Sequence, residues 1–267
     1  MYSGLMFMKR GFLHAFSYKT ALVLTILGTL IGILKFGFMA GFLQDGNSFP
    51  MLTEYGGNLF AYLITGSAFM SFVSLSLNSF QGAIRNEQQM GTLEHLLMSN
   101  IPLGQILLYS GLWNFFFTFL NTSVLFAVAI FMFDVPVNVN IPLTLLILFL
   151  SIVALSGIGL ASAGVIMVTK VGDPINWAFV TFSGFASGVL FPVEVLPGPL
   201  QLIANVLPTT HALKALRLAI TKNITLPVVN SEIWFLVLTS IITIPLGFII
   251  FTWGFNKARE AGSLSEY

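Results

Sequence analysis

A polar segment at residues 85–102 contains the side chains with the clearest potential for recognition. Gly91 interrupts it, Thr92 can cap a new helix, and Glu94 then lies in the first turn, where a carboxylate suits the positive end of a helix. Three apolar side chains have the i, i+3, i+4 spacing of a single helical stripe: Leu93, Leu96 and Leu97. The pattern predicts a short amphipathic helix over residues 85–99 that could place its stripe in a groove of a partner protein. Packing of the same stripe on a membrane surface or on the protein's own helices is equally open.

Basic side chains recur at three-residue intervals later in the chain, at His211, Lys214 and Arg217. Residues three apart share one face of a helix, so this spacing predicts a basic row. Such a row near the outer leaflet of a membrane could hold an anionic headgroup or receive an acidic product. Ordinary anchoring at the membrane interface explains the same residues and remains an alternative.

Enzymatic chemistry is not indicated by any motif. The G-x-x-x-x-G-K-[ST] phosphate loop is absent, so the sequence predicts no ATP site of that kind in this chain. The histidines, His14, His95 and His211, lie far apart without zinc-binding spacing, and cysteine is absent. The net charge of +1 provides no basic field for nucleic acid. We therefore expect a chain that is not an enzyme by itself and holds no cofactor or metal.

The composition places these residues in a membrane. Hydrophobic residues make up 56% of the 267 residues and charged residues only 8%, whereas an ordinary soluble domain has about 25% charged residues. A helix needs about 20 apolar residues to cross the hydrocarbon. We expect one all-α polytopic membrane domain over residues 1–267 with six transmembrane helices: about 21–42, 58–82, 103–133, 142–169, 175–192 and 233–255.

Two further kinds of helix are expected beside the spans. Residues 1–20 mix aromatic and basic side chains and predict an interfacial amphipathic helix, with a disordered tail as the alternative. Residues 195–220 are apolar but broken by prolines, and neither piece is long enough to cross, so we expect two re-entrant helices there. Seven basic residues lie on the side of both termini against three on the other, which favours cytoplasmic termini.

The spans contain few groups that could do chemistry. Apart from Lys35 they carry no ionisable residue at depth, which argues against a proton-coupled carrier or an ion pump and for an energy source elsewhere. The span at 142–169 is rich in small residues that permit close helix approach: Ser156, Gly157, Gly159, Ala161, Ser162, Ala163 and Gly164. We interpret these as packing residues.

Two segments far apart in the sequence form a recognisable pair. The first reads Glu87-x-x-x-Gly91-Thr92-Leu93-Glu94-x-Leu96-Leu97 and is followed by Pro102. The second reads Ser187-Gly188-Val-Leu-Phe-Pro192, then Leu196-Pro197, Leu207-Pro208 and Leu213-Lys214-Ala-Leu216-Arg217. Together they resemble the cytoplasmic loop and the fifth-span region of type-2 ABC export permeases. The chain departs from the family at Thr209-Thr210-His211, where relatives often have a bulkier residue, and this leaves the substrate open.

The resemblance implies a set of partners. In that family the first motif is a coupling helix, here 85–99, that docks on a separate ATPase subunit. The docking residues implied are these: Glu87, Gly91, Thr92, Leu93, Glu94, Leu96 and Leu97. The resemblance also implies two ATPase copies that hold ATP and Mg, and a second copy of this chain as a permease homodimer. The assembly would be integral to a bacterial inner membrane and in contact with its lipid.

The expected function is therefore that of a membrane permease subunit of an ATP-driven exporter. Its substrate would be amphiphilic, a hydrophobic drug or a lipid, moved out of the cytoplasm or the inner leaflet. Export of a lipid-linked polysaccharide is the first alternative. A gradient-driven carrier or channel that needs no ATPase is an alternative of another class, and a non-transporting assembly factor is a third.

Overall fold

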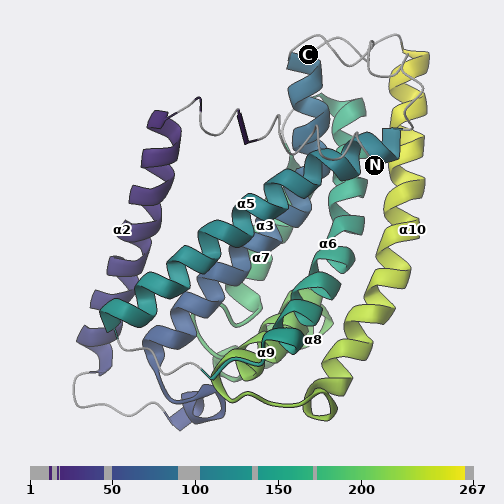
Figure 1. Cartoon of the computed structure of the whole chain (residues 1–267). Coiled ribbons are helices and arrows are strands. Elements are labelled where there is room, and N and C mark those ends of the chain that lie inside the picture. The colour runs from purple at the N-terminus through teal and green to yellow at the C-terminus, as the bar shows by residue number, and fades with distance from the viewer. Residues whose placement is uncertain are drawn as a thin grey trace.

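The computed structural model describes residues 12–13, 17, 19–44, 50–89, 103–133, 138–170 and 173–261. Every regular element within these ranges is a helix. In chain order they are α2 (Lys19–Gln44), η1 (Pro50–Tyr55), α3 (Leu59–Gln89), α5 (Leu103–Phe133), α6 (Ile141–Thr169), α7 (Pro174–Ala186), η2 (Val193–Val195), α8 (Gly198–Val206), α9 (Pro208–Thr221), η3 (Leu226–Val229) and α10 (Asn230–Glu260). Figure 1 shows the long helices forming a bundle, with the short helices gathered at one end.

The described helices include five that are long and apolar enough to cross a membrane: Val23–Leu43, Leu59–Arg85, Leu112–Phe133, Ile141–Thr169 and Leu226–Glu260. Many of their large apolar side chains are exposed, which suits contact with lipid hydrocarbon. The prediction of an all-α polytopic membrane protein is confirmed. The span expected at 175–192 differs, because α7 has 13 residues and ends at Ala186. A helix of that length is about 20 Å long, shorter than the roughly 30 Å of hydrocarbon.

Parallel helices α6 and α10 lie with their backbones in direct contact. The contact uses two pairs of glycines, each two turns from the next: Gly157 with Gly247, and Gly164 with Gly254. A Cβ atom at any of these positions would collide with backbone atoms of the partner helix. Gly159 approaches α3 in the same way, at the carbonyl oxygens of Ser76 and Leu77. The expectation that small residues allow close approach in the 142–169 span is confirmed for its three glycines.

Exposed tryptophans on α10 mark the two membrane boundaries. Trp253 follows Trp234 by 19 residues, so the two are about 28 Å apart along the helix axis. That separation matches the roughly 30 Å thickness of the hydrocarbon, and tryptophan favours the interface on each side. We name the ends of the bundle the Asn230 end and the Glu260 end, after the first and last residues of α10. Helices α3, α6 and α10 all run from the Asn230 end to the Glu260 end (Figure 1).

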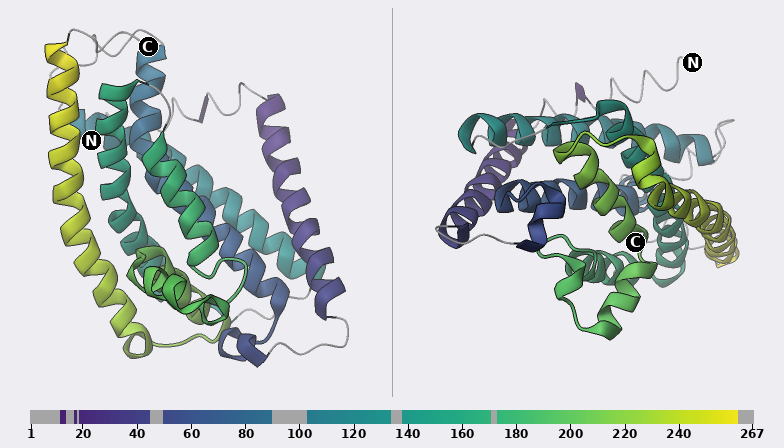
Figure 2. Two further views of the ribbon diagram at one scale, coloured as in Figure 1. Left: turned by 180° about the vertical axis from the view of Figure 1, so that it is seen from behind. Right: turned by 90° about the horizontal axis from the view of Figure 1, so that it is seen from below.

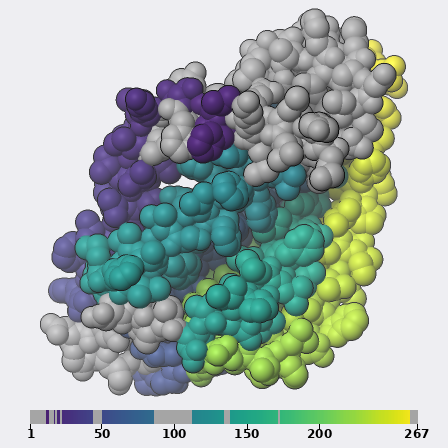
Figure 3. Space-filling view, in the orientation of Figure 1, coloured from purple at the N-terminus to yellow at the C-terminus, as the bar shows by residue number. Residues whose placement is uncertain are grey.

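The short helices cover the Asn230 end. Figure 2, in the view from below, shows η1, α8 and α9 there, and α8 and α9 are the two short helices of the 195–220 region. On the face seen in Figure 3, α5 lies across the bundle and α2 stands at its edge. Phe12, from the expected interfacial helix, has its ring 6.2 Å from that of Trp113, while most of residues 1–20 lie outside the described ranges.

The glycine contact between α6 and α10 gives a stability prediction. Replacement of Gly157 by Leu should lower the free energy of unfolding by about 1–3 kcal/mol or more, because the helices must separate to admit the side chain. Thermal unfolding in detergent measures the effect. Gly41→Leu on α2 is the matched control, since a Cβ there meets no atom within 4 Å. Equal melting temperatures for the two variants would contradict the contact.

Candidate functional site

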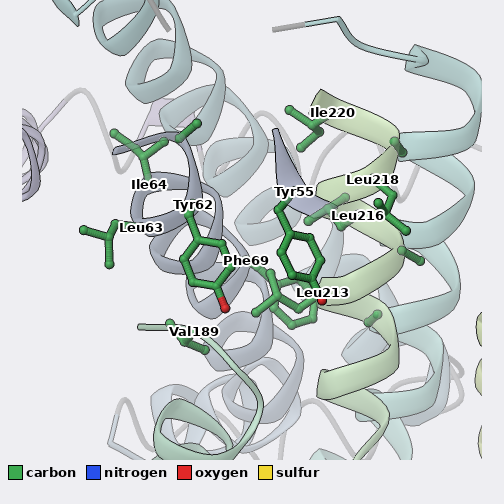
Figure 4. Close-up of a cluster of buried hydrophobic side chains, with 14 of the residues drawn as sticks. Tyr55, Tyr62, Leu63, Ile64, Phe69, Val189, Leu213, Leu216, Leu218 and Ile220 are labelled. Carbon is green, nitrogen blue, oxygen red and sulfur yellow. The ribbon is translucent and has the colours of Figure 1, made fainter. Parts of the chain in front are cut away.

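Arg217 lies among buried side chains at the Asn230 end, although arginine is usually found at a surface. It belongs to α9, which begins at Pro208, a residue suited to the first helical turn because it has no N–H to leave unpaired. Helix α9 is buried on almost every side, and Arg217 itself is 3% exposed. Figure 4 shows the buried hydrophobic cluster at this end, which includes Tyr55, Tyr62, Val189, Leu213 and Leu216. The arginine is thus enclosed by η1, α3, α9 and the segment after α7.

The guanidinium of Arg217 binds backbone oxygens of two other segments. Nη1 donates to the Gly188 oxygen at 2.8 Å, and Nη2 donates to those of Val189 at 3.0 Å and Tyr62 at 3.1 Å. The Tyr62 ring centroid lies 3.3 Å from the guanidinium carbon, a cation–π contact. The Tyr62 hydroxyl also donates to the Gly188 oxygen, at 2.6 Å. One cation therefore joins α3, α9 and the segment that follows α7.

These contacts explain why α7 ends before Pro192, the residue at which we expected the span to end. Gly188 has φ of +81°, a left-handed conformation that glycine adopts without strain, and it turns the chain out of the helix. Its carbonyl and that of Val189 then point to Arg217 instead of a helical N–H. A buried carbonyl left unpaired costs about 1–3 kcal/mol, so the break in α7 depends on the arginine.

Thr209, in the segment that departs from the family pattern, holds α9 against the end of α7. Its side chain is fully buried, its hydroxyl lies 2.5 Å from that of Ser187, and it donates to that of Ser183 at 3.3 Å. A bulkier residue at this position would have to displace α7. The departure therefore accompanies a close contact between the two helices.

His211 and Lys214 have different surroundings from Arg217. The His211 ring stacks on Phe235 with centroids 3.9 Å apart, and its Nε2 lies 2.9 Å from the Asn205 oxygen. The Lys214 ammonium is half-exposed and pairs with the Glu232 carboxylate at 3.5 Å.

All three basic residues line one cavity of about 110 Å³ at the Asn230 end, as the predicted helical row requires. Glu194 and Glu232 line the same cavity, so a bound anion would meet both signs of charge. The expectation that Arg217 contacts an anionic headgroup does not fit its burial, because the side chain is 3% exposed and its Nη1 and Nη2 atoms donate to backbone oxygens.

A polar face on α3 is the second feature of interest, and sequence reasoning missed it. Hydroxyl and amide side chains recur there at intervals of four, three and four residues: Ser67, Ser71, Ser74 and Asn78. This spacing keeps them on one side of the helix over about 16 Å. The spacing of these residues is visible in the sequence, but none of them is charged, so a pattern of charged residues does not reveal them.

Two cavities lie along this polar face. One of about 310 Å³ lies between α2, α3 and α5, where Thr29 donates to Asn121 at 3.2 Å. The other, of about 290 Å³, lies between α3 and α7 beside Trp177. Polar side chains exposed to lipid at this depth are unfavourable, so such a face either lines a water-filled path or is covered by protein.

A third cavity lies across α3 and α5 from the polar face. It has a volume of about 360 Å³ and lies between α3, α5, α6 and α9. Its lining is mostly apolar and aromatic and includes Phe69, Phe72, Phe119 and Phe126. Helices α3 and α5 thus border a partly polar cavity on one side and an apolar cavity on the other. The two cavities together have the mixed character of an amphiphilic molecule.

Comparison with known proteins decides the family. The family model described as ABC-2 type transporter matches residues 4–221. The chain belongs to the ABC-2 type transporter family. It is also similar to Nodulation protein J of Sinorhizobium fredii (strain NBRC 101917 / NGR234), at 26% identity over 208 residues, which cover 75% of this chain and 76% of that protein. The resemblance drawn from the two sequence motifs is confirmed.

Membership of the ABC-2 family fixes the general role of the chain. It is an integral membrane protein and the membrane component of an ABC exporter, and the family implies a partnering ABC ATPase. The segment expected to contact that ATPase falls outside the described residues at Gly91, Thr92, Leu93, Glu94, Leu96 and Leu97, and the Glu87 side chain is also outside. Their docking role stays a prediction.

The Arg217 contacts predict a large loss of stability when the cation is removed. Arg217→Met deletes three hydrogen bonds from a charged donor, each contributing about 1.5–3 kcal/mol, and leaves buried oxygens unpaired. We expect a melting temperature in detergent well below that of the unsubstituted chain. Lys214→Met, one turn earlier on α9, removes a half-exposed cation from the largely buried Glu232 and should lower it less than Arg217→Met does. If both variants unfold alike, Arg217 does not hold the break in α7.

Proposed function

We propose that this chain is the permease subunit of an ATP-driven exporter that moves an amphiphilic molecule out of the cytoplasm or the inner leaflet. The observation that carries the proposal is the ABC-2 family match over residues 4–221. The polar face of α3 adds to it, because its side chains line two cavities along one side of the helix.

The distribution of basic residues supports cytoplasmic termini. Arg85 near the end of α3, Lys170 after α6, and Lys257 with Arg259 on α10 all lie toward the Glu260 end of the bundle. Basic residues favour the cytoplasmic side of a membrane. The Glu260 end is thus assigned to the cytoplasm and the Asn230 end, with Arg217 and the short helices, to the outside.

The substrate path is assigned to the polar face of α3. Figure 2, in the view from behind, shows α3 running between α7 and α2 on that side of the bundle. A second copy of this chain would cover the face and enclose a path between the two subunits. This arrangement removes the polar side chains from lipid without filling the cavities beside them.

Energy would enter through residues 85–99, of which 85–89 belong to the end of α3 and the rest precede α5 in the chain. Two ATPase subunits, which hold ATP and Mg, would dock on Glu87, Gly91, Thr92, Glu94 and the leucine stripe. Their closure on ATP would push on the ends of α3 and α5, which border the cavities. ATP would then favour one of two arrangements of the path.

Two other functions compete with drug or lipid export. An exporter of a lipid-linked polysaccharide is favoured by the hydroxyl and amide side chains along α3. A gradient-driven carrier without an ATPase is the alternative of another class. It is disfavoured because only Asp173 is charged among the described residues that line the two polar cavities.

Purification of the chain from its native membrane distinguishes an ATP-driven exporter from a gradient-driven carrier. The exporter should co-purify with an ATPase and, once reconstituted, should hydrolyse ATP faster when its substrate is present. A homo-oligomer that transports without any ATPase would overturn the proposal. Binding of a partner without stimulated hydrolysis would indicate an assembly factor.

The docking segment gives a prediction about coupling. Gly91→Pro and Glu94→Lys should each uncouple ATP hydrolysis from export, because the first disrupts the start of the helix and the second reverses a charge at its positive end. Substrate movement and phosphate release, measured together in proteoliposomes, report the ratio of the two. Glu54→Lys in η1, an exposed charge reversal at the Asn230 end, should leave that ratio unchanged. If export survived in both docking variants, the assignment would be wrong.

A further inference from the structure

The apolar cavity between α3, α5, α6 and α9 is separate from the path assigned to the substrate. Its volume is about 360 Å³, and none of its described lining residues belongs to the two cavities along the polar face of α3. We propose that it holds one acyl chain of a phospholipid that stays in place and is not transported, with the ester carbonyl of that chain accepting a hydrogen bond from Thr144. The inference goes beyond the export function and does not rest on it.

The inner wall of the cavity is buried and apolar. Phe69 is 1% exposed, and Phe72 and Leu216 are each 3% exposed. A lining of this kind offers water few hydrogen-bond partners, so such a cavity stays dry and takes up apolar molecules. An empty cavity lowers stability in proportion to its volume. An apolar occupant therefore suits this space better than water or a void.

The rim of the cavity is open to the membrane. Phe119 and Val139 are 42% and 40% exposed, and Ser123 and Ala127 are exposed as well. Figure 3 shows α5, which carries three of these residues, lying across the outside of the bundle. Exposed residues at this depth meet lipid hydrocarbon. An acyl chain can thus enter from the side without crossing a polar region.

The length of the cavity matches the chain of one leaflet. Phe119 and Ile130 both line it, and they lie 11 residues apart on α5, or about 16 Å along the helix axis. The hydrocarbon of a bilayer is roughly 30 Å thick, so each leaflet contributes about half of that. The second half of α5 lies toward the Asn230 end (Figure 1). The chain would therefore come from the leaflet at that end.

Thr144 supplies the polar contact. It lies in the first turn of α6, at the Asn230 end, and its Oγ1 atom is buried without a hydrogen-bond partner among the described residues. Ser123, at the same cavity, instead donates to the Phe119 oxygen of its own helix at 2.8 Å. A buried hydroxyl without a partner is unfavourable. Ester carbonyls lie where the headgroups meet the hydrocarbon, so the ester of a chain in this cavity would supply an acceptor.

An occupant of the cavity would support the helix that carries Arg217. Leu216 and Ile220 are four residues apart and share one face of α9, and both line the cavity. Arg217 follows Leu216 directly and points to the oxygens of Gly188 and Val189. The acyl chain would thus pack against α9 as part of the Asn230 end.

A comparison of ester and ether lipids tests the Thr144 contact. The full-length protein with its co-purifying subunits is titrated in detergent with dipalmitoyl phosphatidylcholine or its diether analogue, which lacks the carbonyl, and native mass spectrometry counts the retained lipid. We expect one lipid per chain, with the ester retained about fivefold better than the ether. Thr144→Val should bring the two to equal retention. Thr252→Val, at an exposed threonine of α10 that bonds its own helix, should keep the fivefold ratio.

A cavity-filling variant tests the position of the chain. Ala127→Trp places an indole at the rim of the cavity and should lower retention at least about tenfold. Val124→Trp is the matched control, because Val124 is an exposed residue of the same helix outside the lining. A change from phosphocholine to phosphoglycerol with the same chains should alter retention by less than about twofold, because the cavity holds the chain and not the headgroup.

Five results would overturn the inference. The first two are a purified protein that retains no phospholipid, or retains only free fatty acid, and equal effects of Ala127→Trp and Val124→Trp. The third and fourth are equal retention of ester and ether by the unsubstituted chain and retention that follows the headgroup. The fifth is ATP-driven movement of the retained lipid across the bilayer, which would make it a substrate. Retention is measured without ATP, so absence of an ATPase partner counts against the export function alone.

Discussion

The hydrogen bonds from Arg217 to the oxygens of Gly188, Val189 and Tyr62 are the interaction on which the Asn230 end depends. A helix that stops inside a membrane protein leaves backbone oxygens without donors, and hydrocarbon supplies none. Arginine solves this because its planar guanidinium presents several donors and keeps its charge when buried. The early end of α7 and the contact of α9 with Tyr62 of α3 both involve that one side chain.

Sequence reasoning reached the fold class because length and apolarity alone identify a helix that can cross a bilayer. It reached the family because the paired motifs around Gly91 and Arg217 are read directly from residue identities. It placed the end of the fifth span at Pro192, since proline is the visible helix breaker. The break at Gly188 depends on donors from α9, a contact between segments that no local pattern contains.

The candidate site was harder to predict than the fold. The row of His211, Lys214 and Arg217 shares a helix face as its spacing requires, but spacing does not say whether that face meets solvent, a carboxylate or backbone oxygens. The polar face of α3 was passed over because serine and asparagine are common in apolar helices and hydrogen-bond to their own backbone. Only the cavities beside them distinguish this face from ordinary packing.

Helix α3 carries Tyr62, in contact with Arg217, and Arg85, near its Glu260 end. These residues are 23 positions apart, about 35 Å along the axis, and no proline interrupts the helix between them. Because α3 is one continuous helix between these residues, a displacement at its Glu260 end can reach the break in α7 through the helix itself. The close backbone contact between Gly159 and α3, at Ser76 and Leu77, lies between those two ends.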